Sequence, residues 1–269
     1  MKNLIETSNN NGNSKRNIKL ILEYDGSGYA GWQRLGLAAG KRSIQSLVEE
    51  CLSGYLQEDI KIIGSGRTDA GVHALGQVAN FHCISGRSAE DIKKNLNILL
   101  PEDIKVRYSQ EMDKEFHSRY SAKAKTYEYR IDCGEVQSVF TRKYTYHMPD
   151  FLDLDAMEKA SGYFLGTHDF KAFSTDRKDG KSTVRTIDHI RIYKPEAIKH
   201  QQPSHELRIA ITGDGFLYNM VRIMTGTLIE IGQGLKTPGD VLKIMEGKKR
   251  QQAGTTIGSQ GLFLLEVGY

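Results

Sequence analysis

The segment richest in reactive residue types spans residues 64–77 and reads GSGRTDAGVHALGQ. Four glycines surround one cation, Arg67, one carboxylate, Asp69, and one imidazole, His73. Because glycine permits positive φ and close approach of other groups, such a loop can present Arg67 and Asp69 on a tight, rigid turn. An ionised carboxylate presented in this way can act as a covalent nucleophile. A plain glycine-rich turn in which Arg67 and Asp69 simply pair fits the same residues equally well.

A phosphate-binding loop is the other function that a glycine-rich run suggests. In a GxGxxG pattern that starts at Gly64, the third glycine would fall on Asp69, and no Gly-Lys-Ser/Thr follows. A carboxylate at that place would repel a phosphate group. A nucleotide or dinucleotide phosphate loop is therefore a poor interpretation.

The elements that would position this loop follow the order β, α, β, β, α, β. Ser43 is a suitable helix cap, and Pro101 stops the second helix. Apolar spacing predicts strand 18–24, helix 43–54, strands 60–63 and 77–82, helix 89–99 and strand 104–108.

The same order repeats in the second half of the chain. Apolar spacing predicts strand 126–131, helix 154–164, strands 184–193 and 206–211, helix 216–231, a shorter helix from residue 237, and strand 262–267. We therefore expect an α+β fold of two split-βαβ halves, like those of ferredoxins and RNA-recognition motifs. The halves would share a mainly antiparallel sheet, with the active-site cleft between them.

Three regions follow from this organisation. Residues 1–17 are polar and rich in asparagine, so we expect a disordered tail. Residues 18–115 form the N-terminal half with the Asp69 loop, and residues 116–269 form the C-terminal half.

Composition narrows the class of protein. The chain has 269 residues, a formal net charge of +4 and a pI of about 8.8, which suits a polyanionic partner without demanding one. Since no apolar run approaches the roughly 20 residues of a membrane span and the N-terminus lacks a secretory apolar block, we expect a cytoplasmic protein that does not bind membranes.

Neither a disulfide framework nor a metal site is expected. The three cysteines are far apart in sequence, which predicts free thiols: Cys51, Cys83 and Cys133. Four histidines invite a metal hypothesis, but none has ligand spacing with another His or Cys: His73, His82, His117 and His168.

Residues 67–73, RTDAGVH, closely resemble the signature of the TruA family of tRNA pseudouridine synthases. Four further stretches are similar to this family: 24–33 (YDGSGYAGWQ), 116–127 (FHSRYSAKAKTY), 166–170 (GTHDF) and 215–222 (GFLYNMVR). The resemblance covers nearly the whole chain from Ile18 onward, and an ordered series of this kind is highly specific.

The resemblance implies a role for four residues. Asp69 would be the catalytic nucleophile, and Arg222 would pair with it and keep it ionised despite burial. Arg67 would insert beside a flipped nucleotide, and Tyr127 would stack on the uracil. From the residues alone, Arg222 could instead form a structural salt bridge. Because Tyr127 and Tyr129 alternate on a predicted strand, a core role for Tyr127 also fits.

The resemblance also implies the activity. We expect a homodimeric isomerase, without cofactor or metal, that converts uridine to pseudouridine at positions 38, 39 and 40 of the tRNA anticodon arm. Scattered cations would contact phosphates, among them Lys123, Lys125, Arg177, Lys178, Lys181 and Arg185. Residues 175–182 would form a mobile loop that closes over the RNA. The order of the chemical steps stays open.

One stretch departs from the family pattern. The family usually carries a Thr-Ala-Pro-Pro run before a Gly-Leu, whereas residues 256–260 here read TIGSQ before Gly261 and Leu262. Losing two prolines predicts a looser loop. Two rival interpretations remain: a catalytically idle tRNA-binding or folding factor, and the same isomerase acting on another RNA.

Overall fold

The computed structural model describes residues 15–33, 40, 42–175, 182–196 and 205–269. Ten strands lie in one sheet: β1 (Arg16–Tyr24), β2 (Ile63–Gly64), β3 (His73–Cys83), β4 (Ile104–Met112), β5 (Ala124–Asp132), β6 (Tyr146–His147), β7 (Gly166–Asp169), β8 (Val184–Tyr193), β9 (Glu206–Gly213) and β10 (Leu262–Gly268). The described ranges also contain five α-helices: α1 (Ile44–Leu56), α2 (Ala89–Leu99), α3 (Leu154–Gly162), α4 (Met220–Gly232) and α5 (Asp240–Gly247). Short 3-10 helices are η1 (Gly26–Gly28), η2 (Lys171–Phe173) and η3 (Arg250–Gln252).

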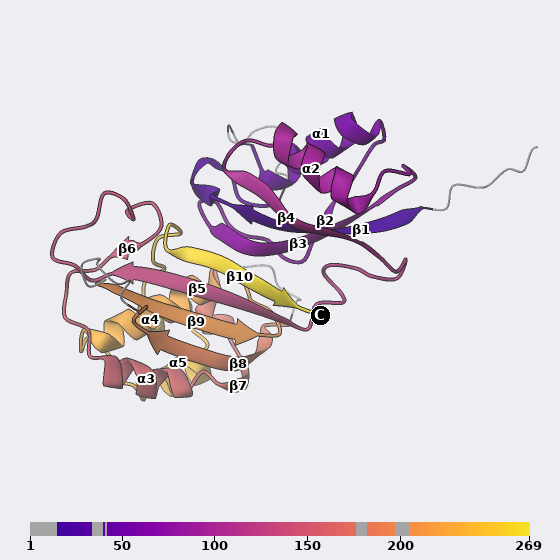
Figure 1. The fold of residues 1–269 in the computed structure, drawn as a ribbon. Helices are drawn as coiled ribbons and strands as arrows, with labels where there is room; N and C mark the ends of the chain where they lie inside the picture. The colour runs from indigo at the N-terminus through magenta and orange to yellow at the C-terminus, as the bar shows by residue number, and fades with distance from the viewer. Residues whose placement is uncertain (1–14, 34–39, 41, 176–181, 197–204) are drawn as a thin grey trace, which may run out of the picture.

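The sheet runs in the order β4-β1-β3-β10-β5-β9-β8-β7, with β2 beside β3 and β6 beside β5. Most neighbouring strands are antiparallel, while β10–β3 and β5–β6 are parallel. The expected α+β fold with a mainly antiparallel sheet is therefore confirmed. Helices α1 and α2 lie against the strands of the N-terminal part, and α3, α4 and α5 gather beside the strands of the C-terminal part (Figure 1).

Strand β10 joins the two parts of the sheet. It comes from the end of the chain, yet it pairs with β3 through Phe263 opposite His73 and with β5 through Leu264 opposite Tyr127. The C-terminal strand thus places the segment after the Asp69 loop beside the strand of Tyr127.

The helix predictions hold with small changes. Ser43 caps α1 as expected, because its side chain accepts a hydrogen bond from Ser46 N, and α2 covers the predicted residues 89–99. The helix predicted for 216–231 starts only at Met220, because Asn219 adopts a left-handed conformation with φ 62°. Residues 216–219 are thereby released from the helix.

Several strand predictions were wrong in extent: the strand predicted for 77–82 spans His73–Cys83, and the strand predicted for 104–108 spans Ile104–Met112. The strand predicted for 60–63 is reduced to Ile63–Gly64, because the amides of Ile60 and Ile62 donate to Ser53 Oγ and Glu49 Oε1 of α1 instead of to a neighbouring strand. Residues 16–17 were predicted to belong to the disordered tail, but they form the start of β1. Of the predicted tail, residues 1–14 lie outside the described residues.

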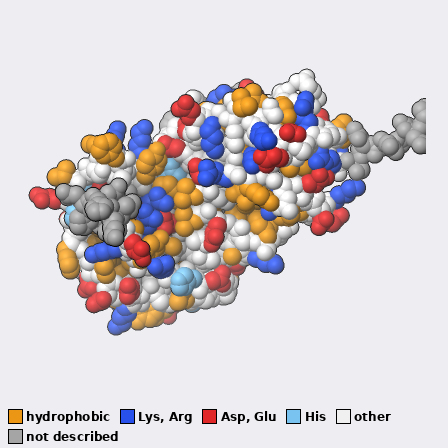
Figure 2. All heavy atoms as spheres, viewed as in Figure 1, with side chains coloured by type: hydrophobic (Ala, Val, Ile, Leu, Met, Phe, Trp, Pro, Cys, Tyr) orange, Lys and Arg blue, Asp and Glu red, His pale blue; other side chains and the backbone are white. Residues whose placement is uncertain are grey.

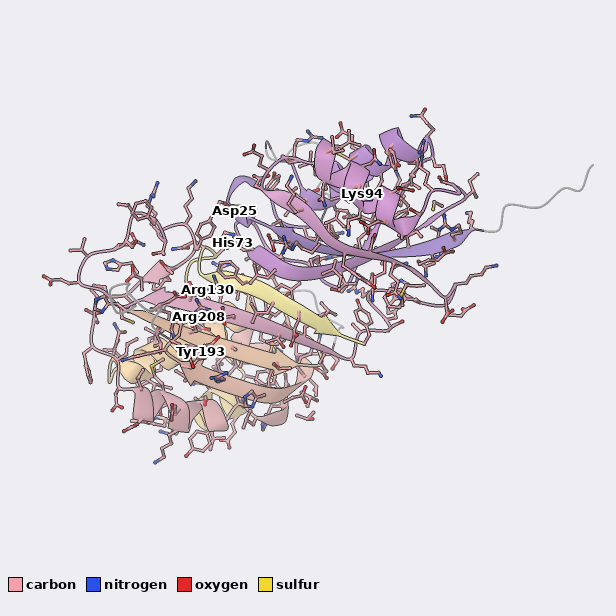
Figure 3. All side chains as sticks on the ribbon, viewed as in Figure 1. Asp25, His73, Lys94, Arg130, Tyr193 and Arg208 are labelled. Atoms are coloured by element: carbon pink, nitrogen blue, oxygen red, sulfur yellow. The ribbon has the colours of Figure 1, made fainter. Side chains whose placement is uncertain are left out.

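A buried carboxylate fixes strand β5 from the face opposite Tyr127. Glu128 is paired with Arg130 at 2.8 Å and lies 3.6 Å from Arg208, while the Tyr193 hydroxyl donates to it at 2.5 Å. Arg130, Arg208 and Tyr193 lie in a row across neighbouring strands (Figure 3). Because this network ties β5 to β8 and β9, it holds Tyr127 in a fixed place on the other face.

Candidate active site

A cavity of about 640 Å³ lies between the N-terminal and C-terminal parts of the chain. Its wall includes all four residues that the sequence singles out: Arg67, Asp69, Tyr127 and Arg222. The volume falls within the range of small-molecule and nucleotide pockets. The fold therefore brings together residues that are more than 150 positions apart in sequence.

Hydrogen bonds on both sides of Asp69 fix its loop. Trp32 N donates to Thr68 O at 3.0 Å, and the hydroxyls of Tyr24 and Thr68 bond at 2.8 Å. Val72 N donates to Asp69 O at 3.1 Å and closes the turn. Because buried strand and loop residues make these contacts, the loop presents its side chains in a defined direction.

The glycines of this loop serve different purposes. Gly71 has φ 78°, a conformation that other residues rarely adopt. Gly66 has an ordinary φ, but a Cβ there would lie 3.3 Å from Lys125 Nζ. The absence of a side chain at Gly66 therefore leaves room for the lysine ammonium beside the Asp69 loop.

Asp69 is half-buried, and burial raises the pKa of its carboxyl above the ordinary value of 3.8. The positive charge of Arg222 acts in the opposite direction and lowers this pKa, but less strongly than burial raises it. In the described part of the chain, Asp69 makes no direct ion pair with Arg222 or with Arg67. A simple Arg67–Asp69 pair is therefore not what the loop forms.

The side chain of Arg222 is held by other groups. Its Nε donates to Ile257 O at 2.7 Å and its Nη1 donates to Asn219 Oδ1 at 2.8 Å. Asn219 in turn donates to Thr175 Oγ1 at 2.7 Å. The guanidinium is thus positioned on the cavity wall by the residue before α4 and by the atypical 256–260 loop.

Further hydrogen bonds hold the atypical loop of residues 256–260 in place. Tyr129 OH donates to Gly258 O at 2.6 Å, and Arg250 Nη2 donates to Thr256 Oγ1 at 2.7 Å. His73 Nε2 lies 3.1 Å from Gln260 O. These hydrogen bonds offset the loosening that the loss of two prolines predicts.

Tyr127 is both a core residue and a wall residue. Its side chain is 7% exposed, and its ring meets that of Phe216 edge to face at a centroid distance of 5.2 Å. Burial, with smaller contributions from Tyr24 and Asp69, raises the pKa of its hydroxyl. The two sequence interpretations, core packing and a ring facing the substrate, are thus compatible.

Arg67 is exposed and forms no hydrogen bond or ion pair with another described residue. It is free to reach a ligand. Of the expected 175–182 loop, residues 176–181, and with them Arg177, Lys178 and Lys181, lie outside the described residues.

The described part of the cavity wall is strongly basic. Among its described residues are five cations, Arg67, Arg119, Lys125, Arg185 and Arg222, against one carboxylate, Asp69. On the face shown in Figure 2, by contrast, acidic and basic side chains are interspersed. Sequence reasoning did not single out Arg119, although it lies within residues 116–127 and that motif was the available signal.

Neither a metal site nor a membrane-spanning helix is present among the described residues. Within the described ranges, no group of three His, Cys, Asp or Glu side chains could hold a metal ion. The helices in these ranges are all too short or too polar to cross a membrane.

One family model and the similar proteins of known name all point to the same family of enzymes. The family described as tRNA pseudouridine synthase matches residues 20–121 and 160–269. A protein of Acetivibrio thermocellus named tRNA pseudouridine synthase A is 44% identical over 254 residues, which are 94% of this chain and 100% of the relative. A Bacillus protein of the same name is 46% identical over 253 residues, with 94% and 99% covered.

Proposed function

We propose that this chain, which belongs to the tRNA pseudouridine synthase family, acts on uridines 38, 39 and 40 of the tRNA anticodon arm with Asp69 as nucleophile. The enzyme is an isomerase that converts uridine in tRNA to pseudouridine. The observation that carries the proposal is the basic cavity, which exposes one carboxylate to a polyanionic ligand.

The reaction breaks the glycosidic bond between C1′ and N1 and forms a bond between C1′ and C5. The proton on C5 is lost and N1 gains one, so the net change is an isomerisation. An ionised Asp69 would attack either the sugar or the base to form a covalent intermediate. Both routes require the carboxylate to be charged, which explains the need for Arg222 near a partly buried group.

The uridine must leave its base stack to reach Asp69, at a cost of a few kcal/mol. Arg67 is exposed at the rim of the site and can occupy the space that the base leaves. Tyr127 then stacks on the flipped uracil, with Phe216 supporting its ring from the edge.

The proposal includes the division of the chain into two similar halves, 18–115 and 116–269. The strand orders β4-β1-β3-β2 and β10-β5-β9-β8 support a duplicated split-βαβ arrangement, because the equivalent strands occupy equivalent places. The cavity lies where these halves meet, and each half contributes part of the site.

We also propose a cytoplasmic homodimer. Four large apolar side chains of the segment between β5 and α3 are exposed: Val136, Val139, Phe140 and Phe151. Burial of such a surface against a second copy would be favourable. Light scattering after gel filtration tests the dimer, and Phe140→Asp should weaken it.

The function is tested by incubating tRNA transcripts with the protein and mapping pseudouridine by carbodiimide treatment and primer extension. The expected result is new pseudouridine at positions 38 to 40 with the wild type and none with Asp69→Asn. Binding without modification would favour an RNA-binding or folding factor, and modification elsewhere would favour another RNA target.

A further inference from the structure

Three cations on the cavity wall lack an acidic partner among the described residues. Lys125 and Arg119 form no side-chain hydrogen bond or ion pair with a described residue, and Arg185 donates only to the backbone oxygens of Ser182 and Val184. None of the three contacts a carboxylate in the described ranges. A group of uncompensated cations in a concave site favours an anionic ligand.

Lys125 is the most confined of the three. It is half-buried, and burial lowers the pKa of its ammonium, with the charges of Arg119 and Arg185 acting in the same direction. A lysine that served only to stabilise the fold would be expected to have a partner. Instead, its surroundings disfavour its charge until an anion binds.

The position of Lys125 relates it to the proposed nucleotide. Lys125 and Tyr127 are two residues apart on β5, so their side chains lie on the same face of the sheet. A Cβ placed on Gly66, next to Arg67 in sequence, would lie 3.3 Å from Lys125 Nζ, so the ammonium is close to the Asp69 loop. An anion on Lys125 would therefore lie beside a base that stacks on Tyr127 and beside the Asp69 loop.

The phosphodiester next to a flipped uridine is the anion that fits this place. We propose that Lys125, with Arg119 and Arg185, binds the backbone phosphate that flanks the target uridine, so that the enzyme recognises a phosphodiester as well as the uracil. This inference rests on the proposed function. It makes Lys125 a positioning residue, which holds the nucleotide in register with Asp69.

The test uses anticodon-arm RNAs in which one phosphate flanking the target carries a neutral methylphosphonate. With the wild type, one flanking replacement should lower kcat/KM by roughly tenfold or more, as expected for loss of a hydrogen bond to a charged group. Lys125→Met should be slowed on unmodified RNA, and the same methylphosphonate should then cause a smaller loss than in the wild type, because Arg119 and Arg185 remain. Lys125→Arg should restore part of the activity.

Lys94→Met is the matched control, because Lys94 is exposed on α2, away from the cavity (Figure 3). It should behave like the wild type with every RNA. Thermal unfolding adds a readout that a structural role would not give: Lys125→Met should be at least as stable as the wild type, because it removes a partly buried, repelled charge.

The outcomes separate this inference from the proposed function. If the wild type fails to modify unaltered RNA, the proposed function fails. If the wild type is active but Lys125→Met equals Lys94→Met, the role of Lys125 is wrong. The inference is also overturned if no flanking methylphosphonate slows the wild type, or if its effect is fully retained in Lys125→Met.

Discussion

Asp69 and Arg222 lie on the wall of one cavity, and the guanidinium lowers the pKa of the carboxyl without forming a direct ion pair with it. Arg222 is instead bonded to Ile257 O and Asn219 Oδ1. A direct bidentate pair would occupy the carboxylate oxygens, whereas a nearby charge favours ionisation and leaves an oxygen open for attack. The arrangement therefore suits a nucleophile better than a structural salt bridge.

Replacing Asp69 with asparagine should abolish turnover and leave tRNA affinity within a few-fold, because the change removes the proposed nucleophile but few phosphate contacts. We expect the rate to fall by at least about a thousandfold. Single-turnover pseudouridine formation and filter binding measure the two effects. Substantial remaining activity would refute the assignment.

The same variant should not lose stability. Burial raises the pKa of Asp69, so the folded state holds the proton more tightly than the unfolded state does. The stability of the wild type therefore decreases as pH rises from the unfolded pKa through the folded one. At neutral pH, Asp69→Asn should unfold at the same temperature as the wild type or a higher one, and a clear decrease would show that the carboxylate supports the fold.

Replacing Arg222 with glutamine should shift the pH dependence of the reaction. In the proposed mechanism activity requires ionised Asp69, so it should be lost as pH falls through a pKa above the ordinary aspartate value. Arg222 lowers that pKa, and its removal should move the acid limb of the single-turnover rate to higher pH. Arg107→Gln, at an exposed pair with Glu23, is the control and should leave the profile unchanged. Coincident profiles for both variants would contradict the role of Arg222.

Replacing Arg67 with alanine should slow conversion and weaken the salt dependence of binding. Arg67 is exposed and has no partner among the described residues, so its charge is available to RNA. Loss of one phosphate contact reduces the slope of log K against log salt by about one. Binding at several salt concentrations and single-turnover rates measure both effects, and an unchanged rate would remove the proposed role in base flipping.

The fold could be predicted well where the apolar periodicity is strong. It was predicted less well where backbone amides donate hydrogen bonds to side chains instead of to a neighbouring strand. The helix at 89–99 has clear spacing and a serine cap, and it was predicted over its full length. The apolar residues around Ile62 look like a strand in sequence, but the amide of Ile62 bonds to Glu49. No local pattern reveals a partner thirteen residues away on a helix.

The site, too, could be predicted only in part: its residues could be identified from the sequence, but the contacts that position them could not. Motif resemblance identified Asp69, Tyr127 and Arg222, and the fold places them on one wall. The hydrogen bond from Arg222 to Ile257 O could not be predicted, because the acceptor is a backbone atom whose direction depends on the loop. In the same way, the relation between Gly66 and Lys125 appears only when β5 is placed beside the Asp69 loop.

Two substitutions at Tyr127 should separate the ring from the hydroxyl. In the described part of the chain the hydroxyl makes no hydrogen bond, while the ring meets Phe216 edge to face. Because stacking on a base is worth roughly 1–3 kcal/mol, Tyr127→Leu should lower kcat/KM by about tenfold or more. Tyr127→Phe keeps the ring and should retain clearly more activity. Equal losses in the two variants would assign the effect to the hydroxyl.

His73 joins segments from both parts of the chain through hydrogen bonds. Gly26 N donates to its Nδ1 at 3.1 Å, so the proton is on Nε2, which lies 3.1 Å from both Lys143 O and Gln260 O. Asp25 lies beside His73, where the N-terminal strands meet β10 (Figure 3). The hydrogen bonds with Gly26 N, Lys143 O and Gln260 O use the neutral ring, whereas Asp25 Oδ1, 3.2 Å from Nδ1, favours the protonated ring.

Burial lowers the pKa of His73 below its ordinary value of 6.5, and this effect exceeds the opposing effect of Asp25. The stability that the neutral ring provides is present above the unfolded pKa and lost as pH falls toward the folded pKa. His73→Gln should therefore be less stable at about pH 8, with a smaller further loss between about pH 7 and pH 5 than the wild type shows.

Urea unfolding at several pH values measures the free energy of unfolding for both proteins. His189→Gln is the control, because His189 is exposed on β8, and its pH dependence should follow the wild type. Parallel pH curves for His73→Gln and the wild type would mean that His73 does not make the junction between the two parts of the chain sensitive to acid.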